Sequence, residues 1–154
     1  MMMNLLDILK KFAKKGMQKN KWVMIDTNIL FSSCFYSSET TVRLFEMLHK
    51  NNFEIVITKD VIEEFFDVTN RKNSNKLFLV QPFLDDLKYT LIPSAEDYTD
   101  VPNIRDEKDR PILAAAIKSD VDYLITGDKD FLVLKDIVKK PKIFTMQEFI
   151  EKFS

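Results

Sequence analysis

Acidic side chains are the main candidates for chemistry in this chain, because the residues that other common active sites require are scarce. The 154 residues include 24 Asp and Glu but only one His, one Cys and two Gly. One Cys and one His cannot form a Cys/His zinc site, and Gly16 and Gly127 are too far apart to form a glycine-rich phosphate-binding loop. Catalysis through a Ser-His or Cys-His pair would have to use His49. A site made of carboxylates alone favours a hard cation such as Mg²⁺.

Two aspartates directly follow predicted buried strands. Asp26 comes after the apolar run Trp22–Ile25, and Asp128 comes after the run at residues 122–126. Because the carboxyl ends of parallel strands meet at one edge of a sheet, where α/β proteins bind ligands, we expect these two side chains to lie close together. Gly127 permits a tight turn that would direct Asp128 back over the sheet, and Asp130 is expected only to cap the next turn. The alternative is a structural role, since Asp also caps helices and forms turns.

A pair of glutamates lies on a predicted helix over residues 60–71. The apolar face of this helix includes Val61 and Phe65, and at about 100° per residue Glu64 falls slightly nearer to that face than Glu63 does. We therefore expect Glu64 to point inward. For either residue the alternative is a solvated helix face.

Asp106 and Asp109 stand at the start of a predicted helix that runs through Ile112 to Ser119. Pro111 fits only in a first turn, so this helix should begin no earlier than about residue 107. Carboxylates are favoured at this positive end of a helix, which leaves capping and metal binding both open for each acid. Spaced three residues apart, the two could face the same point.

These acids would then meet at one edge of a single sheet. Carboxylates packed closely repel one another and raise each other's pKa, so such a site requires a cation at neutral pH. The expected chemistry is that of one or two Mg²⁺ or Mn²⁺ ions, which make a bound water nucleophilic for in-line attack on a phosphodiester.

The elements that must position these acids alternate between strand and helix. Hydrophobic periodicity predicts helices at residues 4–17, 41–50, 60–71, 76–88, 112–119 and 146–153, and strands at residues 22–25, 53–58, 89–92, 122–126 and 142–145. The strand at 22–25 is expected to end in a polar loop at residues 26–28. This alternation predicts an α/β fold with a parallel sheet covered by helices on both faces.

The chain divides into a basic amphipathic extension, residues 1–20, and one domain, residues 21–154. Residues 1–22 contain six lysines and one acid, whereas the rest carries a net charge of −6. We expect the apolar face of the extension to pack on the domain or on a neighbouring subunit, and RNA, an anionic membrane surface or another partner are the alternatives. No apolar run is long enough to span a bilayer, and the single Cys34 fits a reducing cytoplasm.

In four segments the sequence resembles the PIN-domain ribonuclease family, especially the single-domain PIN proteins of toxin–antitoxin pairs. The likeness runs over about residues 22–150 and is carried by Val23–Asn28, Thr58–Phe65, Arg105–Ala116 and Leu124–Phe131. It implies a three-layer α/β/α fold and an endoribonuclease that depends on Mg²⁺ or Mn²⁺. It also implies RNA as the substrate, with an antitoxin protein and a second copy of the chain as candidate partners.

The resemblance further implies roles for individual residues. The positions that match the family's acidic quartet are Asp26, Glu64, Asp109 and Asp128, and Asp106 matches a further acid of the metal site. Asn28 and Thr126 match polar residues that support the acids. The RNA-binding candidates, chosen for their proximity to the acids, are Arg71, Lys72, Lys76, Arg105 and Lys129. The basic extension and the acidic balance of the remainder depart from the family pattern.

Two other functions stay open at this point. A PIN module that binds RNA or a protein without cleaving would retain its affinity after loss of the acids and the metal. Phosphoryl transfer through an aspartyl intermediate at Asp26 is less consistent with the sequence. Enzymes that resemble the haloacid dehalogenases require an Asp at the position where this chain has Asn28.

Overall fold

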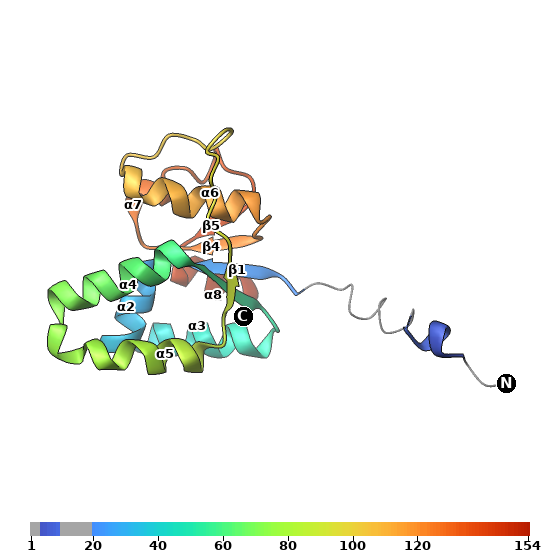
Figure 1. Cartoon of the computed structure of the whole chain (residues 1–154), viewed down its shortest axis with the longest axis horizontal. Coiled ribbons are helices and arrows are strands. Elements are labelled where there is room, and N and C mark those ends of the chain that lie inside the picture. Colours follow the sequence, from blue (N-terminus) through green and yellow to red (C-terminus); the bar gives the residue numbers. More distant parts are fainter. Residues whose placement is uncertain (1–3, 10–19) are drawn as a thin grey trace.

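The computed structural model describes residues 4–9 and 20–154 (Figure 1). Residues 5–9 are helical, and Leu5, Leu6 and Leu9 are 71%, 59% and 55% exposed. The predicted N-terminal helix is therefore seen in part, and its continuation over residues 10–17 lies outside the described residues. The expected packing of its apolar face on the domain is not observed for these leucines. Within the described ranges, no helix has the length and apolar character needed to cross a bilayer.

Five strands form one parallel sheet in the order β3-β2-β1-β4-β5. The strands are β1 (Trp22–Ile25), β2 (Glu54–Thr58), β3 (Thr90–Ile92), β4 (Tyr123–Ile125) and β5 (Lys142–Phe144). The central strand β1 reads as a continuous apolar run because both of its faces are covered, as is usual in parallel sheets. The predicted parallel sheet is confirmed.

Helices cover both faces of this sheet. They are α2 (Thr27–Phe35), α3 (Glu39–Lys50), α4 (Lys59–Lys72), α5 (Val80–Leu87), α6 (Arg110–Lys118), α7 (Lys129–Leu132) and α8 (Met146–Phe153), with 3₁₀ turns η1 (Ser74–Leu79) and η2 (Glu107–Asp109). In Figure 1, α6 and α7 lie above the sheet, α2, α3 and α5 lie below it, and α8 packs against α3. These three layers confirm the predicted α/β/α class.

Three segments differ from the prediction. The predicted polar loop at residues 26–28 is wrong, because α2 begins at Thr27, with Asp26 in the extended N-cap conformation (φ −65°, ψ 150°). Apolar residues are spread around α2, so hydrophobic periodicity does not reveal this helix. The predicted helix at 76–88 consists of two elements, η1 and α5. Helix α7 is only one turn long, which is too short for a periodic signal.

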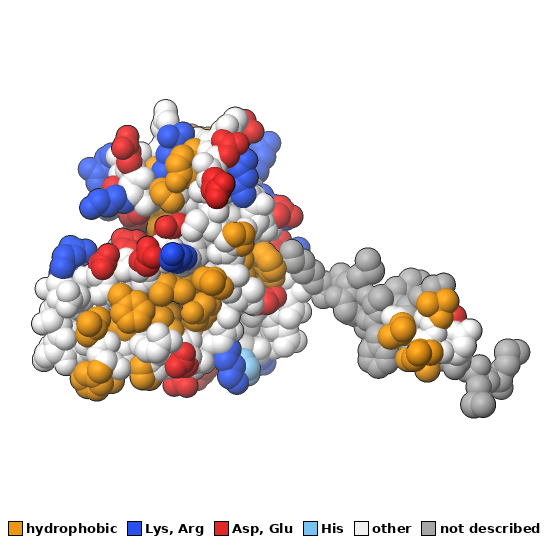
Figure 2. Space-filling model, in the orientation of Figure 1, with side chains coloured by type: hydrophobic (Ala, Val, Ile, Leu, Met, Phe, Trp, Pro, Cys, Tyr) orange, Lys and Arg blue, Asp and Glu red, His pale blue; other side chains and the backbone are white. Residues whose placement is uncertain are grey.

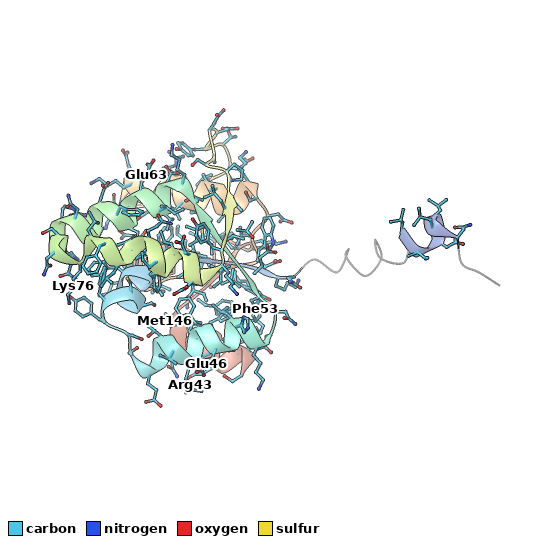
Figure 3. All side chains as sticks on the ribbon, turned by 60° about the horizontal axis from the view of Figure 1, so that its bottom comes forward. Arg43, Glu46, Phe53, Glu63, Lys76 and Met146 are labelled. Atoms are coloured by element: carbon cyan, nitrogen blue, oxygen red, sulfur yellow. The ribbon has the colours of Figure 1, made fainter. Side chains whose placement is uncertain are left out.

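An aromatic cluster attaches α8 to the sheet. The ring of Phe149 is fully buried, and its centroid lies 5.3 Å from Phe53, 5.6 Å from Tyr123, 5.7 Å from Phe144 and 4.6 Å from Phe153. Aromatic pairs at such distances contribute about 0.5–1.5 kcal/mol each beyond the area that they bury. The contacts join β4, β5 and the residue before β2 to the C-terminal helix, and Phe53 is labelled in Figure 3.

Replacing Phe149 should therefore be costly. We expect Phe149→Ala to lower the free energy of unfolding by about 3–5 kcal/mol, because it removes a buried ring and leaves a cavity among four others. Urea unfolding followed by circular dichroism measures the change. Val133→Ala, at a side chain that is 72% exposed, is the control and should change the stability by less than about 0.5 kcal/mol. A loss of stability for Phe149→Ala no greater than that of the control would contradict this account.

Candidate active site

The candidate site lies where the chain changes direction within the sheet. From β1 the chain proceeds to β2 and β3 on one side, and then crosses to β4 and β5 on the other. Ligands of open α/β sheets bind at the carboxyl ends of the strands beside such a switch point. Ile25 of β1 pairs with Ile125 of β4, so the residues that follow, Asp26 and Thr126, are neighbours. Figure 2 shows acidic side chains gathered where the upper layer meets α4.

A chain of hydrogen bonds connects the acids of these two strand ends. Thr126 Oγ1 donates to Asp26 Oδ2 over 2.9 Å and accepts from the backbone N–H of Asp128 over 3.0 Å. Asp26 and Thr126 are both buried. The position of Asp128 therefore depends on Thr126. The turn does not require the predicted glycine, because Gly127 has no positive φ and a Cβ there would meet no atom within 4 Å.

Helix α4 brings Glu64 to the same place. Thr58 caps this helix by accepting from the backbone N–H of Val61 over 3.2 Å. One and a half turns later, Glu64 Oε2 accepts from the hydroxyl of Thr27 on α2 over 3.0 Å. Glu63 is exposed, and its carboxylate lies 3.6 Å from Lys59 Nζ. The structure thus places Glu64 rather than Glu63 beside the other acids, as the helix-face argument predicts.

The two acids near the start of α6 differ in whether they cap a helix. Asp106 is exposed, and its carboxylate caps η2 by accepting from the backbone N–H of Lys108 over 3.1 Å. Asp109 is only 7% exposed and makes no capping bond. Its Oδ2 atom is buried without a hydrogen-bond partner among the described residues. Capping therefore accounts for Asp106 and leaves Asp109 unexplained by local structure.

Burial and repulsion shift the pKa of Asp26 upward. This pKa rises from 3.8 to about 6, with burial as the largest cause and the charges of Glu64 and Asp128 as further upward contributions. The hydrogen bond from Thr126 acts in the opposite direction, because it stabilises the charged carboxylate. Like Asp109, Asp26 makes no side-chain capping bond, although it occupies the N-cap position of α2.

Asp109 shows the same effect more strongly. Its pKa rises from 3.8 to about 7, mainly through burial, with added repulsion from Asp128, Asp106, Asp26 and Glu64. The five acids predicted from the sequence thus share one electrostatic environment. Strongly raised carboxyl pKa values are typical of catalytic and metal-binding sites.

Asp130 joins this cluster, although the sequence predicted only a capping role for it. One carboxylate oxygen from each of Asp109, Asp128 and Asp130 lies within 4.8 Å of the other two. Asp128 caps α7 by accepting from the backbone N–H of Asp130 over 2.9 Å, which places both carboxylates on one turn. Arg105 Nε donates to Asp130 Oδ1 over 2.8 Å. Arg105, predicted to contact RNA, is therefore paired with an acid of the cluster. The signal in the sequence was the Asp128–Asp130 spacing directly after a strand.

The donor set fits a hard divalent cation. Three carboxylates lie within reach of one ion, and the unpartnered Asp109 Oδ2 lacks the hydrogen-bond donor that a buried oxygen normally has. Mg²⁺ and Mn²⁺ are bound by carboxylate oxygens. A bound cation would also stabilise the charged forms of Asp26 and Asp109, which burial and repulsion disfavour.

The remaining predicted residues lie around this cluster in different settings. Asn28 is exposed and makes no side-chain hydrogen bond to a described residue, and the neighbouring Thr27 makes the bond to Glu64 instead. A groove of about 490 Å³ adjoins Glu64, and its lining residues are Asp60, Glu63, Glu64, Asp67, Arg71, Lys108 and Ile112. Lys72, Lys76 and Lys129 are exposed.

We expect the metal-free chain to become less stable as the pH rises from about 4 to about 8. The folded-state pKa of Asp26 is about 6 against an ordinary value of 3.8, so over this interval the folded chain keeps a proton that the unfolded chain has released. This contribution to stability is complete below the unfolded pKa and is lost as the pH rises through the folded pKa.

Asp26→Asn has no charge to bury. In EDTA at about pH 8 this variant should exceed the wild type in free energy of unfolding by about 1–3 kcal/mol, and at about pH 4 the difference should vanish. Urea unfolding at both pH values measures it. A difference that does not depend on pH would contradict the raised pKa.

Comparisons with known proteins agree with this geometry. A family model described as the PIN domain matches residues 22–130. A similar solved structure is a chain of VapBC2 from Rickettsia felis bound to a DNA fragment from their promoter. It has a TM-score of 0.62 and 20% sequence identity, and the match covers 80% of this chain and 98% of that chain. At this identity the likeness shows the fold. A comparison with curated proteins found no match. Because the family model matches well over half of the sequence, this chain belongs to the PIN domain family.

Proposed function

We propose that this chain is a metal-dependent endoribonuclease that hydrolyses RNA phosphodiester bonds. The observation that carries the proposal is the meeting of Asp26, Glu64, Asp109 and Asp128 at the switch point of the sheet, two of them with strongly raised pKa values and without capping roles. A folded chain does not gather buried like charges without a compensating partner. Membership of the PIN family, whose members are typically nucleases, supports the same conclusion.

The residues that would hold Mg²⁺ or Mn²⁺ are Asp109, Asp128 and Asp130, whose carboxylate oxygens lie within 4.8 Å of one another, together with the neighbouring acids Asp26, Glu64 and Asp106. When bound, such a cation supplies Lewis-acid stabilisation of phosphate charge and a water of lowered pKa. The chain itself sets the orientation of the ligands. Thr126 holds Asp26, and Thr27 holds Glu64, each through one hydroxyl hydrogen bond. The groove beside Glu64, lined by residues of α4, η2 and α6, gives a substrate access to these acids.

The candidates for contact with the RNA backbone are Arg71, Lys72, Lys76, Arg105 and Lys129. The first three extend along and beyond the C-terminal end of α4, Lys129 directly follows Asp128, and Arg105 is hydrogen-bonded to Asp130. We further propose that the protein is the toxin of a toxin–antitoxin pair in the cytoplasm, able to form homodimers and held by an antitoxin protein. The likeness in fold to a chain of the VapBC2 complex supports this part of the proposal.

Cleavage of RNA with Mg²⁺ or Mn²⁺ tests the proposed activity. We expect Asp26→Asn and Asp128→Asn each to reduce the rate by about 100-fold or more, because each removes charge at the site where a cation would be held. Glu151→Gln, on the exposed side of α8, is the control and should cleave at the wild-type rate. RNA binding by the wild type without cleavage under either metal would contradict the proposal and favour a non-catalytic PIN module.

The two adjacent glutamates of α4 allow a closer test. Glu64→Gln should reduce cleavage by about 100-fold and weaken Mn²⁺ binding, because this carboxylate lies among the other acids. Glu63→Gln removes the same charge one residue away, where the carboxylate is paired with Lys59 and exposed, and should cost less than about threefold. Calorimetric titration with Mn²⁺ and initial cleavage rates measure the two effects. Equal reductions in the two variants would show that general charge, and not this position, matters.

A further inference from the structure

Helices α2 and α4 run side by side from the acidic site in matching register. At one end the Thr27 hydroxyl donates to Glu64, and at the other end Asn73 Nδ2 donates to the Tyr36 hydroxyl over 3.2 Å. Both pairs are separated by 37 residues in the sequence. At 1.5 Å per residue, the nine residues from Thr27 to Tyr36 correspond to about 13.5 Å along the axis of α2. The packed helix pair thus connects the site with Tyr36.

Tyr36 is an exposed aromatic ring held in a defined position. The Tyr36 residue is 62% exposed, although its aromatic ring is large and apolar. Its ring lies 5.9 Å from the buried ring of Phe31, centroid to centroid, and its hydroxyl is held by Asn73. Tyr36 and Asn73 are the C-caps of α2 and α4. A further planar group could stack on this ring at little cost in conformational freedom.

The end of α4 and the η1 turn, which lie next to the Tyr36–Asn73 hydrogen bond, are basic in an otherwise acidic domain, whereas Glu39 is the acid nearest to Tyr36 in the sequence. Between Asp67 and Asp85 the sequence contains Arg71, Lys72 and Lys76 and no acid. The ammonium group of Lys72 lies 5.6 Å from the centroid of Phe31, the same ring that contacts Tyr36.

None of these three basic side chains forms an ion pair with another described residue. In Figure 3, Lys76 lies at the end of the α4–η1–α5 hairpin that is remote from Glu63. The charge on α4 therefore changes from acidic near the catalytic site to basic near Tyr36, and the basic end has no protein counter-ion in the described chain.

We propose that Tyr36 is a base-stacking subsite for a single-stranded segment of the RNA substrate, with the phosphates of that segment on Lys72 and Lys76. The inference rests on the proposed ribonuclease function and specifies how the substrate is held. Aromatic rings combined with a basic surface are the usual means of binding single strands without sequence preference. At about 3.4 Å per stacked nucleotide, the axial separation of Thr27 and Tyr36 corresponds to about four nucleotides. An unpaired basic surface fits an RNA backbone, and residues 68–84, which supply it, contain no acid to bind a basic protein segment.

Binding of a labelled twelve-nucleotide single-stranded RNA to the full chain, measured by fluorescence anisotropy in EDTA, tests this subsite. Tyr36→Ala should weaken binding by between about 5-fold and 150-fold, the range for removal of one stacked base. Tyr36→Phe keeps the ring and removes only the bond to Asn73, so it should bind within twofold of the wild type. Leu91→Ala, at a 58% exposed apolar residue of β3, is the matched surface control and should not change binding.

Two further measurements separate stacking from a general surface effect. A twelve-base-pair RNA duplex has no free base faces along its length, so Tyr36→Ala should leave duplex binding unchanged. Replacing Lys72 and Lys76 by Gln should lower the slope of log affinity against log salt by about 0.7 for each phosphate that the variant no longer neutralises.

Wild-type affinity of Tyr36→Ala for the single strand, an equal reduction for the duplex, or an unchanged salt slope in the lysine variant would overturn the proposal. Because EDTA prevents metal-dependent cleavage, these results do not depend on whether the chain cuts RNA. If the variants behave as expected and the wild type still fails to cleave with Mg²⁺ or Mn²⁺, the subsite stands and the ribonuclease proposal falls.

Discussion

Repulsion among carboxylates at the carboxyl ends of β1 and β4 is the constraint on which the rest of this structure depends. Burial is the largest cause of the raised pKa values of Asp26 and Asp109, and repulsion from the neighbouring acids raises both values as well. A flexible loop would relieve such repulsion by moving apart. Here each acid is attached to an element that cannot move independently, because its strand or helix is packed in the common core. The favourable packing of the domain core thus offsets the unfavourable free energy of the clustered acids.

Two threonine hydroxyls fix the positions of acidic side chains by hydrogen bonds. Thr126 lies between Asp26 and Asp128 and contacts both, and Thr27 at the start of α2 holds Glu64. Neither hydroxyl is itself a strong metal ligand. Each one instead fixes the orientation of a carboxylate, a role that commonly affects metal affinity as well as ligand geometry. The same α2–α4 contact continues away from the site to Tyr36 and Asn73, so the element that orients Glu64 also presents the basic and aromatic surface.

The prediction from sequence succeeded where a local signal was sufficient. Apolar runs followed by Asp26 and Asp128 indicated two strand ends, and the order of helices and strands indicated a parallel sheet. The helix-face argument distinguished Glu64 from Glu63 because the angle between adjacent helical residues is constant. Helix α2 was missed entirely, since its apolar residues show no clear period, and Asp130 was read as a cap because its spacing from Asp128 suits a turn equally well.

The sequence by itself determined most element types, the parallel sheet and the small set of acids available for chemistry, since these follow from composition, from short apolar runs and from the helical period of 3.6 residues. Only the tertiary structure decided which acids are caps and which are not. Asp106 and Asp109 have the same local context, three residues apart at one helix start, yet the first caps η2 in the open and the second is buried with an unpartnered oxygen. Capping is a contact between near neighbours in the chain, whereas the burial of Asp109 depends on elements distant in sequence. Contacts between residues that are distant in the sequence leave no local pattern. For the same reason, the sequence did not predict the hydrogen bond between Tyr36 and Asn73 or the matching register of α2 and α4.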